Sequence, residues 1–344
     1  MKLGIIGLTQ SGKATVFEAL TKQPLDISHK QESTTCAIRV PDKRIDFLSN
    51  IYTPKKTTYA QITYFLPGAT DRDKDTSAMQ EAANKARDCD ALIHVVRNFN
   101  IFGGEAPDPY ADFKTFNDEM MLADLMVVEK RLERLELDKK RGKNIYPEEV
   151  SLLHQCLENL EKEIPLRKCP DLASAPYLKG YAFLSLKPML VLFNNDDEDD
   201  NIPKTSELLF KETCMAIRGK LEQELVQMSD KDAAEFLLEF NIKTSAMDRV
   251  IKKSYHLIGL ISFFTVGNDE VKAWTIQKNT TALNAADVIH SDIKKGFIRA
   301  EVLSYEEFIS AGSHQEAKKR GTLRLEGKTY EVRDGDIINF RFNV

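Results

Sequence analysis

The 344-residue sequence is poor in residues that form disulfide frameworks or zinc sites. It has five cysteines, an odd number, and none stands in a C-x-x-C pair, which argues against secreted disulfide scaffolds and zinc ribbons and fits reduced thiols. Its six histidines show no H-x-x-H or H-E-x-x-H spacing, so no zinc enzyme is indicated. His94 lies in an apolar segment and is expected to be a core residue.

Long apolar runs and an excess of basic residues are also missing. No apolar stretch reaches the length of a membrane-spanning helix, about 18 residues, and the apolar start of the chain is too short for a signal peptide. Lys and Arg number 48 against 53 Asp and Glu, which argues against a basic coat for nucleic acid and leaves only local basic patches open. With 42% hydrophobic and 29% charged residues, the sequence predicts a globular cytoplasmic protein without a membrane partner.

Short apolar segments alternate with helical patterns over much of the chain. Residues 91–96 and 189–193 are continuous apolar runs, as expected for strands covered on both faces of a parallel sheet. The alternation predicts a doubly wound α/β domain. The expected strands are 2–6, 59–66, 91–96 and 189–193, and the expected helices include 78–89 and 208–225.

Two runs at heptad spacing interrupt this domain. The first contains Met121, Leu125, Val128, Leu132 and Leu135, and the second contains Val150, Leu153, Leu157, Leu160 and Ile164. The short polar connection between them predicts an antiparallel helical hairpin. Each run covers only about two heptads, so a coiled coil and two amphipathic helices lying on a core both remain open.

The end of the chain has a different pattern. A hairpin is expected from 322–326 and 329–332, a turn at Asp334-Gly335, a helix over 305–319, and a final strand in which 338, 340, 342 and 344 are apolar. These segments predict a small β-rich module with one helix.

Residues 7–13 match the G-x-x-x-x-G-K pattern of a phosphate-binding loop, between an expected strand and an expected helix. Glycines at both ends let backbone N–H groups converge on phosphate oxygens, and Lys13 supplies a positive charge. The sequence therefore predicts a nucleotide site containing Gly7, Gln10, Ser11, Gly12, Lys13, Ala14 and Thr15.

The position after the lysine departs from the pattern. A Ser or Thr there would ligate Mg²⁺ through its hydroxyl, but the residue is Ala14. Thr15 is a poor substitute, because one step along a helix rotates the side chain by about 100°. We therefore expect Mg²⁺, if it binds with the nucleotide, to be weakly coordinated.

Longer stretches resemble the YchF family, the Obg-like ATPases. Residues 273–276, 285–292, 295–302 and 334–344 are similar to the C-terminal domain of that family, and 123–135 to its helical segment. The resemblance implies a GTPase-type P-loop domain that prefers ATP, a coiled-coil insertion, a C-terminal TGS domain of β-grasp type, and association with ribosomes or translation factors. The implied domains are 1–120 plus 180–265 for the nucleotide, 121–179 for the helical insertion and 266–344 for the TGS-like module.

The resemblance also locates base-reading and metal-side positions. Asn194 and Asp197 fall on the family's N-x-x-E motif, but N-x-x-D is also close to the guanine-reading pattern, so ATP and GTP both remain open. Leu66 stands where the Asp of the D-x-x-G motif belongs, and 70–76 lacks the glycines that follow in the family. Loss of two metal-side groups predicts impaired hydrolysis.

The expected function is binding of ATP or GTP with weakened hydrolysis, coupled to a ribosome- or translation-associated partner. Two alternatives remain: an active ATPase or GTPase with substitute metal ligands, and an interaction protein with a vestigial phosphate loop. A ribosomal or other RNA partner would contact the hairpin tip at Lys139, Lys140, Arg141 and Lys143, and the C-terminal module at Lys294, Lys295, Lys318, Lys319 and Arg320.

Overall fold

The computed structural model describes residues 1–25, 32–68, 76–203, 212–239 and 245–343. Contacts divide the chain into two compact units, one of Met1–Ala37 with Thr63–Val250 and one of Ile38–Ile62 with Ile251–Val344. The sequence patterns did not anticipate that residues 38–62 belong with the C-terminal part. The three-domain division implied by the resemblance stays a prediction.

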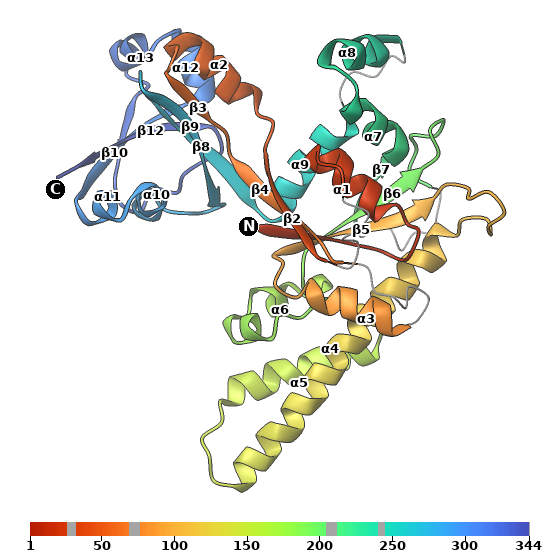
Figure 1. Ribbon diagram of the computed structural model, residues 1–344. Coiled ribbons are helices and arrows are strands. Elements are labelled where there is room, and N and C mark those ends of the chain that lie inside the picture. The colour runs from red at the N-terminus through yellow and green to blue at the C-terminus, as the bar shows by residue number, and fades with distance from the viewer. Residues whose placement is uncertain (26–31, 69–75, 204–211, 240–244, 344) are drawn as a thin grey trace. The chain divides into compact units, whose positions relative to one another are not determined.

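The first unit is built on a six-stranded sheet in the order β2-β4-β1-β5-β6-β7, in which β1 pairs with β4 and β5, and β6 pairs with β5 and β7, all in parallel. Figure 1 shows α1 and α7 on one face and α3 and α4 on the other, as expected for a doubly wound domain. The strands are β1 Lys2–Ile6, β2 Thr34–Arg39, β4 Gln61–Leu66, β5 Ala91–Asn98, β6 Met189–Asn195 and β7 Thr213–Ile217. The helices are α1 Lys13–Thr21, α3 Thr76–Lys85, α7 Gly219–Gln227 and α8 Asp230–Glu239, and α9 Ala246–Leu257 begins in this unit and ends in the second.

The central strands confirm the reading of continuous apolar runs as buried strands, because every residue of β6 is buried and β5 is buried over its first six positions. The helix expected over 208–225 is wrong in its first part. Strand β7 lies at Thr213–Ile217 and pairs with β6, and α7 begins only at Gly219. Five residues give too short a pattern to separate strand from helix, and pairing with β6 decides the conformation.

The helical hairpin is confirmed, and its first helix is longer than predicted. Helix α4 runs from Pro109 to Lys140 and is capped by Asp108, whose carboxylate accepts a hydrogen bond from the Ala111 N–H at 3.0 Å. The early turns of α4 contribute Phe113 and Phe116 to the core beneath the sheet. The hairpin is therefore anchored in the first unit by the same helix that forms its first arm.

Beyond that anchor, α4 packs against α5, Pro147–Glu161 (Figure 1). Buried seam residues include Val128 and Leu135 on α4 and Leu153 and Leu160 on α5. The same cluster includes side chains of the connection after α5, which contains the short helices η2 Leu166–Lys168, α6 Pro170–Ser174 and η3 Pro176–Tyr181. The two helices thus pack on each other and on a covering segment, which combines features of the two arrangements left open by the sequence.

The second unit has a six-stranded mixed sheet in the order β11-β10-β12-β8-β9-β3. Strands β8 and β12 are parallel neighbours, and each has an antiparallel partner, β9 and β10 respectively. Helix α10 covers one face, burying Ala282, Ala285 and Ala286 against the sheet. The strands are β3 Lys56–Thr58, β8 Leu260–Val266, β9 Glu270–Gln277, β10 Phe297–Ser304, β11 Arg324–Glu326 and β12 Asp336–Phe342, and the helices are α2 Lys43–Tyr52, α10 Ala282–Ile289, α11 Ser291–Lys295, α12 Tyr305–Ala311 and α13 His314–Arg320.

Three C-terminal expectations are wrong. The β-rich module was expected to have one helix, and its described residues form four, α10 to α13. The expected hairpin of 322–326 with 329–332 does not form, because β11 pairs with β10 while 329–332 contributes only a bridge between Glu331 and Thr281. The expected helix over 305–319 is broken into α12 and α13 by Gly312, whose φ of 76° ends the first helix. The turn at Asp334-Gly335 is confirmed, with Gly335 at φ 92°.

Two further expectations concern His94 and the cysteines. His94 is fully buried and its ring lies 4.9 Å from that of Phe116, which confirms it as a core residue. Burial lowers the pKa of His94 to about 3, so its imidazole is neutral at physiological pH.

The five cysteines are free thiols. In the described ranges, we find no helix with the length and apolar character required to span a bilayer.

Candidate nucleotide site

The phosphate-binding loop connects β1 to α1, as the sequence predicts. A Cβ atom on Gly7 would clash with the carbonyl oxygen of Val95, so the backbone turns there only with glycine. Gly12 has φ 85°, a conformation that L side chains rarely adopt, and a Cβ there would clash with the side-chain amide of Asn194. Both glycines of the motif are therefore required by close approaches to other strands, not only by the loop.

The N-terminus of α1 is suited to an anion. In the described part of the chain it has no side-chain cap, and its first turn contains no acidic residue. Backbone N–H groups in such a turn can donate to phosphate oxygens, and the helix dipole favours negative charge. The Lys13 ammonium donates to the Leu8 carbonyl oxygen at 3.2 Å, so it lies against the loop that it would help to close around a phosphate.

The other loop residues differ in exposure. Gln10 is exposed and has φ 62°, a left-handed conformation within the tight loop. Ser11 is only 2% exposed, and its hydroxyl has no hydrogen-bond partner among the described residues. Ser11 is therefore part of the loop's packing, and the backbone rather than this hydroxyl is available to a ligand.

Two metal-side positions that the structure describes have no side-chain oxygen. Ala14 is exposed at the start of α1, and Thr15, one residue further on, is half-buried. Leu66 ends β4 with 8% exposure, so an apolar side chain occupies the position of the expected carboxylate. Across the described ranges, no group of three His, Cys, Asp or Glu side chains could hold a metal ion. The side chains at these positions therefore do not fit a conventional Mg²⁺ site.

Asn194, at the end of β6, ties two loops together. Its Nδ2 donates to the Ser11 carbonyl oxygen at 3.2 Å, and its Oδ1 accepts from the Gly219 N–H at 2.9 Å. With 4% exposure, this amide is committed to holding the loop in position.

Asp197 is exposed, and its carboxylate has no partner among the described residues. Of the two residues predicted to recognise the base, Asp197 is therefore the one accessible to a ligand.

Gly219 is a site residue that sequence reasoning missed. It begins α7, directly after β7, and its N–H completes the Asn194 bridge. The signal for it is the strand-turn-helix order of 213–219, which a single predicted helix over 208–225 conceals.

The segment 70–76, which lacks the glycines found there in the family, lies almost wholly outside the described residues. Only Thr76, the first residue of α3, is within them.

We expect Gly219→Ala to weaken nucleotide binding and to destabilise the first unit by about 1–3 kcal/mol, the usual cost of an overpacked position. The new Cβ would lie 2.5 Å from Asn194 Oδ1, so the amide that holds the loop must move. Gly180→Ala is the matched control, because a Cβ there meets nothing within 4 Å. Thermal unfolding and nucleotide titration measure both effects, and equal behaviour of the two variants would contradict this role of Asn194.

The predicted partner contacts differ in their availability. At the hairpin tip, Lys143 pairs with Asp138 at 2.7 Å, whereas Lys139, Lys140 and Arg141 are exposed and have no ion-pair partner among the residues that the structure describes. In the C-terminal unit, most of the predicted cations are paired: Lys294 with Asp287, Lys295 with Asp292, and Lys319 and Arg320 with Glu316. The tip is therefore the more available of the two surfaces.

Comparisons with known proteins agree with this architecture. The family YchF-GTPase_C, described as a protein of unknown function (DUF933), matches residues 260–343. The chain is 36% identical to the ribosome-binding ATPase YchF of Haemophilus influenzae, over 100% of this chain and 99% of that protein. It is also 36% identical to the protein of the same name from Bacillus subtilis, with 99% of each covered.

Solved structures show the same fold. The YchF GTPase of Schizosaccharomyces pombe superposes with a TM-score of 0.82 at 27% identity, covering 99% of this chain and 97% of that one. A GTP-binding protein from Pyrococcus horikoshii OT3 covers all of both chains with a TM-score of 0.55 at 18% identity, and shares the fold alone. The expected P-loop fold class is confirmed, and because the similarity to curated relatives extends over the whole length, this chain belongs to the YchF family.

Proposed function

We propose that this chain binds ATP or GTP at the loop of Gly7–Lys13, hydrolyses it slowly, and associates with ribosomes in the cytoplasm. The observation that carries the proposal is a contrast within one site. The backbone cradle and Lys13 are intact, while Ala14 and Leu66 offer no oxygen on the metal side. Binding by backbone N–H groups needs only the first feature, whereas phosphoryl transfer also depends on charge neutralisation by a metal.

The residues assigned to the nucleotide are Gly7, Gln10, Ser11, Gly12, Lys13, Ala14, Thr15, Asn194 and Asp197. Within this set, the loop and the start of α1 would hold the phosphates, and Asn194 would position the loop. Asp197 would face the base, where its carboxylate can accept from amino or imino groups of a purine. Mg²⁺ bound with the nucleotide would be held by phosphate oxygens and water more than by this chain.

Calorimetric titration of ATP and GTP, each with and without Mg²⁺, tests the nucleotide proposal. We expect saturable binding whose affinity changes little when Mg²⁺ is removed. Lys13→Ala should weaken binding about tenfold to 100-fold, since a hydrogen bond to a charged group is worth about 1.5–3 kcal/mol. The control is Lys130→Ala, which removes an exposed lysine on α4.

Two results would favour the alternatives. Absence of affinity at millimolar nucleotide would mean that the phosphate loop is vestigial and that the chain is an interaction protein. Strong dependence of binding on Mg²⁺ would mean that other groups of the chain replace the missing ligands, as an active ATPase or GTPase requires.

The ribosome part of the proposal rests on the names of the relatives and on the basic tip of the hairpin. Lys139 and Lys140 occupy the last turn of α4, and Arg141 follows it, so three exposed cations extend from one helix end. Exposed cations of this kind can contact RNA phosphates without reading sequence. The alternative is that these exposed cations contribute only to the solubility of the protein.

We expect the triple variant Lys139→Gln, Lys140→Gln, Arg141→Gln to reduce co-sedimentation with ribosomes. The slope of log affinity against log salt should fall by about one for each lost phosphate contact. Lys143→Gln is the matched control, because Asp138 already neutralises that lysine and its removal should change binding less. Equal co-sedimentation of wild type and triple variant at low and high salt would remove the tip from the interface.

A further inference from the structure

Arg218 stands at the carboxyl end of β7 and reaches the loop that follows β6. It comes directly after Ile217, the last residue of that strand, and is the N-cap residue of α7. Its Nη1 donates a long hydrogen bond, 3.4 Å, to the carbonyl oxygen of Asp197. Arg218 is half-buried, and no carboxylate among the described residues forms an ion pair with it. Within the described chain, most of the five N–H donors of the guanidinium therefore remain without an acceptor.

The acidic loop after β6 contains both occupied and open carboxylates. Asp196 accepts from the Asn100 N–H at 3.3 Å, and Asp199 accepts from the Asn201 N–H at 2.9 Å. Asp197 lies between them, is exposed, and has a carboxylate without a hydrogen-bond partner in the part of the chain that the structure describes. An open carboxylate and an open guanidinium thus belong to two residues that touch each other.

Both residues lie at the edge of the sheet that carries the phosphate loop. Strands β1, β5, β6 and β7 are parallel, so their carboxyl ends meet at one edge, and ligands of open α/β sheets bind at that edge. The Asn194 amide fixes the arrangement, because it donates to the Ser11 carbonyl oxygen at 3.2 Å and accepts from the Gly219 N–H at 2.9 Å. Asp197 is three residues after Asn194, and Arg218 directly precedes Gly219. The pair is therefore placed beside the loop that would hold the phosphates.

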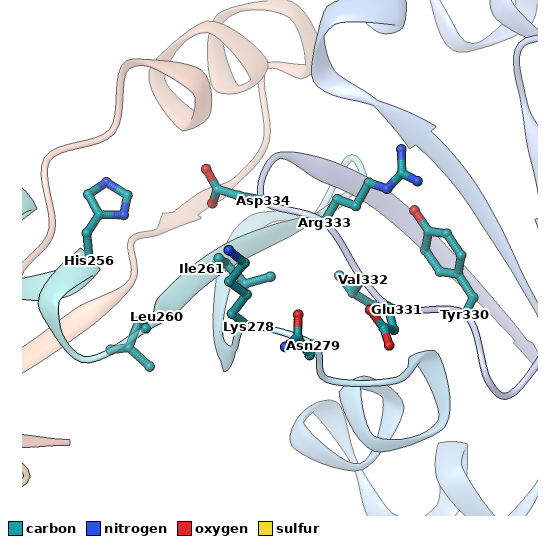
Figure 2. Close-up of a pocket in the computed structure, with 11 residues that line it drawn as sticks. His256, Leu260, Ile261, Lys278, Asn279, Tyr330, Glu331, Val332, Arg333 and Asp334 are labelled. Atoms are coloured by element: carbon teal, nitrogen blue, oxygen red, sulfur yellow. The ribbon is translucent and has the colours of Figure 1, made fainter. Parts of the chain in front are cut away.

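A cavity elsewhere in the chain offers no comparable selection. Figure 2 shows it in the second unit, with a volume of about 530 Å³. Lys278 and Arg333 are matched there by Glu331 and Asp334, and Asp334 is already paired with Arg44 at 2.8 Å. The lining has no surplus charge, and the phosphate loop belongs to the other unit. This cavity therefore gives no argument for a second nucleotide site.

Guanine and adenine present different hydrogen-bonding patterns to a carboxylate and a guanidinium. Guanine has acceptors at O6 and N7 and donors at N1 and the 2-amino group, whereas adenine has a 6-amino donor in place of O6 and a lone pair at N1. A guanidinium can only donate, and a carboxylate can only accept. Guanine therefore satisfies both groups, while adenine sets its amino group against the guanidinium and its N1 lone pair against the carboxylate.

We propose that Arg218 and Asp197 select guanine over adenine, and that GTP is the nucleotide of this chain. The inference rests on the proposed binding of a nucleotide at the phosphate loop, and it departs from the ATP preference that the family resemblance implies. Arg218 donates to O6 of the base, and Asp197 accepts from N1 and from the 2-amino group. The base is uncharged, so the other acidic side chains of the loop do not oppose its binding.

Calorimetric titration of the full chain with GTP, ATP and ITP tests the proposal. We expect GTP to bind about tenfold to 100-fold more tightly than ATP, the discrimination that one good base contact supplies. ITP has the O6 of guanine but lacks the 2-amino group. It should bind about tenfold more weakly than GTP, because Asp197 loses one charge-assisted hydrogen bond.

Two variants separate the two base contacts. Arg218→Ala should weaken GTP binding about tenfold, leave ATP binding nearly unchanged, and preserve the ratio of GTP to ITP affinity, since Asp197 still contacts the 2-amino group. Asp197→Asn should weaken GTP binding to a similar extent and strengthen the binding of XTP, whose 2-carbonyl oxygen can accept from a side-chain amide. A purely structural role of either residue would change the affinity of all nucleotides alike.

Asp200→Asn and Arg249→Gln are the matched controls, because Asp200 is an exposed carboxylate of the same loop and Arg249 is an exposed cation on α9. Neither should alter the order of nucleotide affinities. The proposal is overturned if the wild type binds ATP as tightly as GTP, or if Arg218→Ala and Asp197→Asn weaken every nucleotide equally. Saturable binding without base selection overturns this inference alone, whereas the absence of binding by any nucleotide overturns the proposed nucleotide site as well.

Discussion

Asp124→Ala is expected to lower the free energy of unfolding of the first unit by about 3–5 kcal/mol, the cost of breaking a buried ion pair from one side. Asp124 lies on α4 with no exposed surface. Its carboxylate accepts hydrogen bonds from the Leu184 N–H at 3.0 Å, from the Ser185 N–H at 2.7 Å and from Arg87 at 3.0 Å. Removing it leaves two buried backbone donors without an acceptor and takes from Arg87 its ion-pair partner, although the guanidinium keeps its hydrogen bonds to Asn84 and to backbone carbonyls.

The matched control for this prediction lies on the same helix. Asp118 also pairs with a cation, Lys114, at 2.6 Å, but the pair is exposed and one helical turn apart. Such pairs contribute about 0.3–0.5 kcal/mol, so Asp118→Ala should change stability little. Denaturant unfolding followed by circular dichroism compares the two variants. If Asp124→Ala unfolds at the same denaturant concentration as Asp118→Ala, the buried carboxylate does not hold α4 against the segment before β6.

Restoring both metal-side groups, Ala14→Ser with Leu66→Asp, is expected to raise Mg²⁺-dependent nucleotide hydrolysis about 100-fold or more. Loss of a single stabilising group in a catalytic site commonly costs that factor. Ala14→Ser alone should recover part of the metal dependence, because a serine hydroxyl after the loop lysine can ligate Mg²⁺. Phosphate release under steady-state conditions, with ATP and with GTP, measures the effect.

Two controls separate metal binding from other effects of these substitutions. Leu66→Asn has nearly the shape of Leu66→Asp without its charge, so Ala14→Ser with Leu66→Asn should show less rescue. Adding Lys13→Ala to the rescued chain should abolish turnover, which distinguishes it from a contaminating ATPase. Because Leu66 is 8% exposed, a carboxylate there has a desolvation cost, and thermal unfolding must show that the variant is folded. Robust Mg²⁺-dependent turnover by the wild type, constant through purification, would contradict the expectation of impaired hydrolysis.

The parts of the fold that were predictable are those whose signal is local. The phosphate loop needs only a strand, two glycines, a lysine and a helix in succession, so its pattern is complete within 2–21. Strands β5 and β6 each begin with a run of mostly apolar residues, because a central parallel strand is covered on both faces whatever its neighbours are. The helical seams also repeat over enough turns to be recognised.

The errors fall on short segments whose conformation depends on a distant partner. Thr213–Ile217 is a strand because β6 offers it a free edge, and Arg324–Glu326 pairs with β10 instead of with the segment that follows it. In both cases three to five residues carry too little periodicity to decide between structures, and long-range hydrogen bonds decide.

The sequence by itself determined the central strands of the first sheet, the position of the phosphate loop and the absence of oxygen ligands at Ala14 and Leu66, because each of these is a property of consecutive residues. Tertiary structure alone decided which residues meet. Asn194 joins Ser11 to Gly219 across 183 and 25 residues, and Asp124 holds backbone groups 60 and 61 residues away. The physical reason is that this amide and this carboxylate look like ordinary surface residues in the sequence. Only chain folding removes them from water and supplies their partners.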